Sequence, residues 1–260
     1  MGRDARRPYP TRPSRRITPC HPTGAPALST QQTNPIDAVM EQASEALNTG
    51  RYLDAALRCR SALTLARDEH DFERMHRICM PMLEAQRYLR QDALDSGVIH
   101  TIAKPSDIPE TPGAECYLFA PSFVGADALR FRKAANDAGF APFVLTREPT
   151  TSKNQWPIVG VAQRVVRVRL DPPENDTPNP KWFSNASERL GDQGIRDALD
   201  AAKPDDPPAW VVDDFLDRLD ACPEHEKFIM ALAQACADAI GQPRPTTKRR
   251  RGIVDDPYSF

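Results

Sequence analysis

The residues best suited to binding chemistry lie in one polar stretch, residues 146–156, which reads TREPTTSKNQW. Arg147 and Lys153 carry positive charge, hydroxyl side chains lie between them, and Trp156 ends the stretch. Cations and hydroxyls together can bind an anion, and loops at the ends of strands often carry binding sites. We therefore expect this stretch to supply any small-ligand site. The alternative is a surface loop whose Trp156 packs on the core.

No catalytic residue, metal ligand or cofactor-binding residue is predicted. Glu73 and His76 are spaced to share one helix face, but a di-iron bundle site needs a second copy and further Glu residues, which the sequence lacks. The stretch PSFVG, residues 121–125, follows an apolar run. One glycine beside a proline cannot wrap phosphates as a nucleotide-binding loop does. We expect no cofactor.

Charge and composition limit the partners. Arg167 and Arg169 give one predicted strand a basic face, which suggests a platform for single-stranded nucleic acid. The net charge is only -2, however, and acidic residues outnumber basic ones in residues 174–241, so nucleic acid is not an expected partner. No apolar run is long enough to cross a membrane. The six cysteines include no CxxC pair, which favours free thiols in a reducing cytoplasm.

Proline placement suggests five segments, because most of the 26 prolines gather in boundaries and tails. The predicted segments are a basic, disordered tail (1–33), a helical unit (34–96), a small α/β domain (97–173), an acidic helical unit (174–241) and a second disordered tail (242–260).

The clearest fold signal is a pair of amphipathic helices within residues 34–67. Asn34 and Pro35 suit a helix start, and Gly50 suits the turn between the helices. The second helix is predicted to bury small side chains, so the two helices can lie close together. A third helix is expected over residues 71–95, with a kink or restart at Pro81.

This pair resembles one tetratricopeptide (TPR) repeat unit, which spans about 34 residues. Gly50, Tyr52, Ala55 and Ala62 stand at the offsets of that family, although Ala46 and Cys59 replace large aromatics and Arg67 replaces a closing Pro. A plain helical hairpin is the alternative. Residues 179–202 align in part with residues 34–67. This suggests either a degenerate second copy of the unit, with two short helices, or chance similarity.

The middle of the chain changes to a strand pattern. Strands are expected at residues 98–103, 116–120, 140–146, 158–162 and 165–170, with a helix at 125–138. A strand, helix and strand within about 30 residues predict a parallel βαβ unit, and the last two strands predict a hairpin at the edge. The expected fold class is therefore α+β, mainly helical, with TPR-like hairpin units around a small βαβ-plus-hairpin domain.

The TPR resemblance implies a surface that binds other proteins or peptides, and we expect a non-catalytic scaffold. Asp37, Glu41 and Glu45 form an acidic stripe that would either prefer a basic partner or simply face water. In the C-terminal tail, Tyr258 and Phe260 follow a cationic run and suggest a short binding motif, with an inert charged tail as the alternative. The competing function is a small anion- or nucleotide-binding α/β domain with possible enzymatic activity.

Overall fold

The computed structural model describes residues 34–246. The segments 1–33 and 247–260 lie outside the described residues, as do the predictions made for the first tail, for all but residues 242–246 of the second, and for Tyr258 and Phe260.

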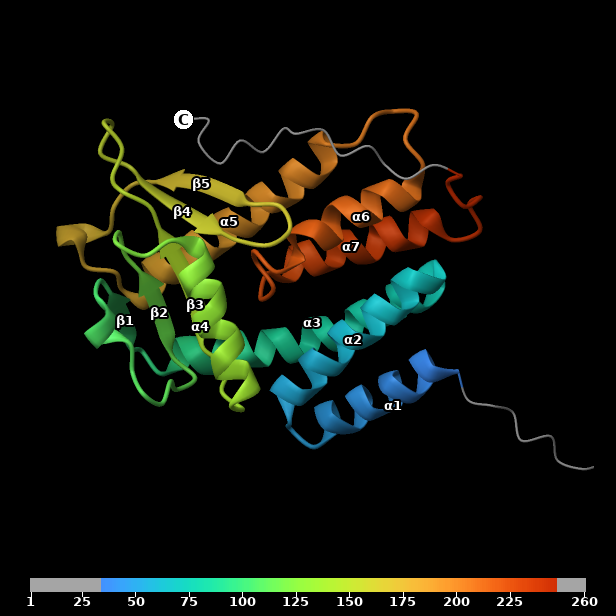
Figure 1. The fold of residues 1–260 in the computed structure, drawn as a ribbon, viewed down its shortest axis with the longest axis horizontal. Helices are drawn as coiled ribbons and strands as arrows, with labels where there is room; N and C mark the ends of the chain where they lie inside the picture. The colour runs from blue at the N-terminus through green and yellow to red at the C-terminus, as the bar shows by residue number, and fades with distance from the viewer. Residues whose placement is uncertain (1–33, 247–260) are drawn as a thin grey trace, which may run out of the picture. The chain divides into compact units, whose positions relative to one another are not determined.

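The fold class is α+β and mainly helical, as predicted (Figure 1). The helices are α1 (Pro35–Asn48), α2 (Tyr52–Glu69), α3 (Phe72–Asp95), α4 (Gly125–Asp137), α5 (Pro180–Asp200), α6 (Pro208–Leu219) and α7 (Glu226–Ala239). The strands are β1 (Ile99–Ile102), β2 (Cys116–Phe119), β3 (Phe143–Arg147), β4 (Trp156–Gly160) and β5 (Val166–Leu170). Short 3-10 turns cover Pro105–Asp107 and Glu174–Asp176.

Helices α1 and α2 form the N-terminal hairpin, which begins and turns where its capping residues predict. The Asn34 side chain accepts a hydrogen bond of 2.8 Å from the backbone N–H of Ile36, which starts α1. Gly50 adopts a φ of 73° in the turn to α2. The facing surfaces of α1, α2 and α3 are rich in buried alanine: Ala43, Ala46, Ala55, Ala56, Ala62 and Ala85. Small side chains let the helix backbones approach closely, while the TPR resemblance itself stays a prediction.

Enlarging one of these alanines is expected to destabilise the hairpin. Ala55 and Ala62 are fully buried, so Ala55→Leu or Ala62→Leu should lower the free energy of unfolding by about 1–3 kcal/mol. Ser61→Leu is the matched control, because Ser61 is the exposed neighbour of Ala62 on α2. Thermal melts of the three variants test this, and an unchanged midpoint for both alanine variants would mean that the helices are loosely packed.

Helix α3 continues through Pro81, so of the predicted kink or restart, the restart does not occur. Proline removes one backbone hydrogen bond, but side chains on both sides of it are buried: Ile78, Cys79, Met82 and Leu83. Their packing holds the helix in one piece across the missing bond.

The sheet has the order β1-β2-β3-β4-β5. Strands β1, β2 and β3 are parallel, and β4 and β5 continue the sheet as an antiparallel hairpin at its edge. The predicted parallel βαβ unit and edge hairpin are therefore confirmed. Side chains of β2 alternate between the two faces: Tyr117 and Phe119 pack with α4 residues, whereas Cys116 and Leu118 pack in a cluster with α5 residues.

Helix α5 corrects a second prediction, because residues 180–200 form one helix rather than two. Gly191 lies inside it and meets another helix instead of making a turn. A Cβ at Gly191 would lie 2.1 Å from Cγ of the His225 ring, so only glycine fits this contact. The stretch 186–198, which aligns with the N-terminal hairpin, therefore contains no turn.

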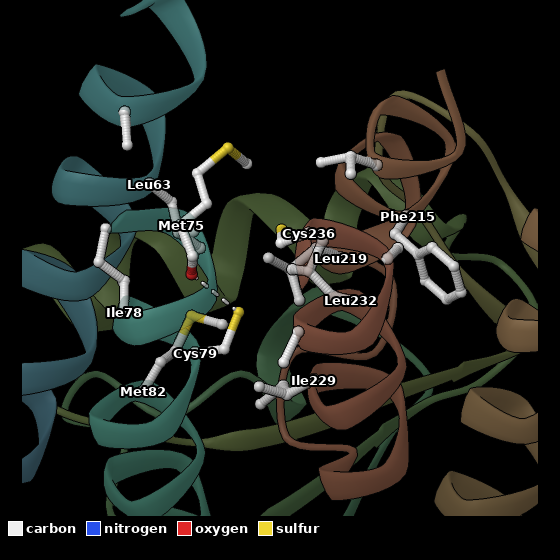
Figure 2. Packing of buried hydrophobic residues seen from close by; sticks show 14 of the residues in the cluster. Leu63, Met75, Ile78, Cys79, Met82, Phe215, Leu219, Ile229, Leu232 and Cys236 are labelled. Carbon is white, nitrogen blue, oxygen red and sulfur yellow. Dashed lines mark hydrogen bonds between the residues drawn. The ribbon is translucent and has the colours of Figure 1, made fainter. Parts of the chain in front are cut away.

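Helices from the two ends of the described chain share one core. Figure 2 shows Met75, Cys79 and Met82 of α3 facing Leu232 and Cys236 of α7. Phe215 and Leu219 of α6 belong to the same cluster. The helices of residues 34–96 and 174–241 thus pack against each other, although the strands of the sheet lie between them in the sequence.

Candidate functional site

A cleft of about 430 Å³ lies between the N-terminal hairpin and α4, and we call it the α2–α4 cleft. Helices α2 and α3 supply an apolar wall made of Leu53, Ala56, Leu57 and Leu89. Helix α4 supplies Leu129, Arg132 and Lys133, and the loop between α6 and α7 supplies Asp220, Pro223 and Glu224. Residues 141–143, at the start of β3, also line it, so five segments of the chain build one cavity.

Buried charges fix the α6–α7 loop in this cleft. Arg132 and Glu224 are both largely buried and lie 3.6 Å apart. Arg132 also donates a hydrogen bond to the backbone carbonyl of Asp220, while Arg60 pairs with the carboxylate of Asp220. Burial lowers the pKa of Arg60 to about 10 and raises the pKa of Glu224. Arg132 and Glu224 thus compensate each other's burial and tie the loop to α4, while the partly exposed pair of Arg60 and Asp220 ties it to α2.

The charges that line the cleft balance. Three cations (Arg60, Arg132 and Lys133) stand against three carboxylates (Asp137, Asp220 and Glu224). A cleft of this kind does not select a strongly anionic or cationic ligand by its net charge. Its distinctive feature is the apolar wall, where the side chain of Leu57 remains 43% exposed.

The polar stretch 146–156 makes a smaller hollow of about 150 Å³. The guanidinium carbon of Arg147 lies 4.0 Å from the centre of the Trp156 ring, and Arg147 donates a hydrogen bond of 3.2 Å to the hydroxyl of Thr150. Asp176 lines the same hollow. Burial lowers the pKa of Arg147, and the Asp176 carboxylate opposes that shift. This carboxylate also weakens the attraction of the hollow for an anion.

The structure brings Arg147 and Trp156 together but leaves Lys153 apart. Trp156 is only 4% exposed and packs edge to face against Trp182 at 5.5 Å. Lys153 is exposed and does not line the hollow. Of the two cations expected to converge, only Arg147 reaches it.

The acidic stripe of α1 is divided between two environments. Arg74 of α3 holds Asp37 with two hydrogen bonds of 2.8 and 2.9 Å, and this contact lowers the pKa of Asp37. Glu41 and Glu45 are exposed. Asp37 therefore joins α1 to α3, and only the other two carboxylates remain on the outer face.

The basic face predicted for β5 is also partly occupied. Arg167 donates two hydrogen bonds, of 2.9 and 2.8 Å, to the carboxylate of Glu148. This bidentate pair joins β5 to the residue after β3. Arg169 is exposed.

A buried histidine faces carboxylates between α5 and α7. His225 Nδ1 accepts a hydrogen bond of 3.1 Å from the backbone N–H of Phe228 and so caps α7. Its Nε2 lies 3.3 Å from Glu188 Oε2 and 3.5 Å from Asp192 Oδ1. Burial lowers the pKa of His225, although Glu188 and Asp192 act in the opposite direction and Lys227 adds to the lowering.

Mild acid should therefore destabilise the protein through His225. The pKa of His225 in the folded protein is below the ordinary 6.5, so His225 binds a proton more tightly in the unfolded chain. Stability is then lost as the pH falls below the unfolded-state pKa. Urea denaturation at pH values between about 7.5 and 5.5 measures this loss. His225→Asn keeps a capping acceptor without a titrating ring, so it should show a smaller loss; equal losses in both proteins would contradict the assignment.

Residues 34–246 contain neither a metal-ligand cluster nor a helix suited to crossing a membrane. In this part of the chain, no three His, Cys, Asp or Glu side chains gather as metal ligands would. No helix among the same residues combines the length and apolar character that crossing a membrane requires. Of the pair Glu73 and His76, His76 Nδ1 lies 2.9 Å from the carbonyl oxygen of Ala233.

Comparison of the chain with protein-family models, with curated proteins and with solved structures found no match.

Proposed function

We propose that this protein is a non-catalytic binding protein and that the α2–α4 cleft receives a short segment of a partner protein. The observation that carries the proposal is the cleft itself, which combines an apolar wall with a rim of polar side chains. Its volume of about 430 Å³ falls within the range typical of ligand pockets. The resemblance of residues 34–67 to a peptide-binding repeat supports a peptide as the ligand.

The lining predicts the chemistry of that segment. An apolar side chain of the partner would lie against Leu53, Leu57 and Leu89, where it would displace water from exposed apolar surface. Polar groups beside it would meet Lys133 and Asp137 at the α4 side. Because cations and carboxylates balance in the lining, the affinity should depend only weakly on salt.

Selection from a random peptide library on the purified protein tests the proposal. We expect enriched peptides to bind the wild type and to lose at least about tenfold in affinity on Leu57→Asp, because an apolar side chain would then face a carboxylate. Leu65→Asp is the matched control: Leu65 lies on the same helix, is 39% exposed and does not line the cleft.

The binding results distinguish a peptide site in the cleft from a site elsewhere on the protein. Peptides that bind the wild type and Leu65→Asp but fail on Leu57→Asp would support the cleft as the binding site. A library that yields no binders, or binders that tolerate Leu57→Asp, would overturn the proposal. Thermal melts of both variants confirm that any loss of binding does not arise from unfolding.

A further inference from the structure

A second hollow, distinct from the α2–α4 cleft, lies where the C-terminal end of α5, the N-terminal part of α6 and the C-terminal half of α7 meet. This groove has a volume of about 460 Å³ and an apolar floor that includes Val211, Phe215 and Ala235. Leu199 at the end of α5 lines it and is 53% exposed. Asp206 and Asp238 add two negative charges to its lining and Lys203 adds one positive charge, while Asp206 also accepts a hydrogen bond from the backbone N–H of Lys203. The groove and the cleft share no lining residue.

We propose that this groove binds residues 248–260 of the same chain. The first argument is position. Ala235 and Asp238 lie in the last turns of α7, which ends at Ala239, so the chain leaves the helix beside the groove. The structure describes the chain as far as Thr246, with Arg244 donating a hydrogen bond to the backbone carbonyl of Glu69, and the fourteen residues 247–260 that follow can span up to about 45 Å. Residues 248–260 can therefore reach the groove without any change in the described fold.

The second argument is chemical complementarity. The segment reads KRRRGIVDDPYSF, so a cationic run precedes the apolar and aromatic residues Ile253, Val254, Tyr258 and Phe260. Aromatic side chains contribute to binding when they are buried, and the groove offers an apolar floor for them. The cations at 248–251 suit the carboxylates of Asp206 and Asp238.

The third argument is local concentration. A segment tethered next to its site is present at an effective concentration in the millimolar range for a short linker, which favours the chain's own tail over a separate partner. A weak intrinsic affinity is therefore sufficient for the groove to be occupied.

The test uses a fluorescent peptide of sequence 248–260 and the chain shortened to end at residue 247. We expect the peptide to bind the shortened chain and to bind the full chain at least about tenfold more weakly, because the tethered tail competes. Leu199→Asp in the shortened chain should weaken peptide binding at least about tenfold. Met230→Asp is the control, since Met230 is 59% exposed on α7 and does not line the groove.

Hydrogen exchange adds an independent readout. Backbone amides of α6 and of the α7 end should exchange more slowly in the full chain than in the shortened one. No peptide binding, equal binding by Leu199→Asp, or equal exchange in both chains would overturn the proposal. A tail-dependent dimer at micromolar concentration would overturn it too, because the occupant would then be a second copy. None of these results bears on the α2–α4 cleft.

Discussion

Gly160→Ala is expected to be among the most destabilising single substitutions in this chain. Gly160 ends β4, and a Cβ there would lie 2.2 Å from the backbone oxygen of Ala221 and 2.8 Å from its carbonyl carbon. A flexible side chain could move aside, but these are backbone atoms in the loop that also carries Asp220 and Glu224. We expect the free energy of unfolding to fall by about 3 kcal/mol or more.

Urea denaturation with an unchanged slope measures this effect, and Gly113→Ala is the matched control. A Cβ at Gly113 would meet only the side chain of Glu115, at 3.3 Å or more, so this change should be close to neutral. Equal stability of the two variants would mean that β4 does not contact the α6–α7 loop as closely as described. Because that loop forms one side of the α2–α4 cleft, Gly160→Ala should also weaken binding there.

The parts of the fold that depend on neighbouring residues could be predicted from the sequence. Asn34 and Pro35 fixed the start of α1, and Gly50 fixed the turn to α2, because caps and turns are decided within a few residues. The parallel strands β2 and β3 followed from their spacing around one helix. The TPR resemblance stays a prediction.

The errors arose where distant residues decide the local structure. Gly191 suits a turn as well as a close contact between helices, and only the ring of His225 shows which applies. Pro81 predicts a kink or a restart, but the helix does not restart, because the packing of α3 on α7 holds it in one piece. Asp37 belongs to an acidic stripe in the sequence pattern, but in the structure it accepts a hydrogen bond from Arg74, 37 residues later. Such contacts leave no signal in the local pattern.

The candidate site was predicted only in part, for the same reason. Four residues of the stretch 146–156 line a small hollow, and its role as a binding site stays a prediction, whereas the larger cleft combines α2, α3, α4 and the α6–α7 loop. One signal was present in the sequence. Leu53 and Leu57 lie four residues apart on α2 and outside its buried alanine stripe, so a second apolar stripe indicated a second contact surface.

Phe228→Ala is expected to destabilise the whole helical core, including the N-terminal hairpin. Phe228 is fully buried in α7, and its ring lies 5.3 Å from that of Phe215 in an edge-to-face arrangement. Removing the ring leaves a cavity in the cluster that α7 shares with α3, so the free energy of unfolding should fall by about 3–5 kcal/mol. Met230→Ala, on the exposed side of α7, should cost less than about 0.5 kcal/mol.

The regions that lose protection in Phe228→Ala tell more about the fold than the size of the stability loss. If α1, α2 and α3 depend on α7 through the shared core, amides of residues 35–69 and of residues 226–239 should lose protection at the same urea concentration in Phe228→Ala. Hydrogen exchange with mass spectrometry resolves the two regions. A hairpin that keeps its wild-type protection while α7 unfolds would show that residues 34–96 fold by themselves. The α2–α4 cleft would then lie between two separately stable parts, rather than within one cooperative structure.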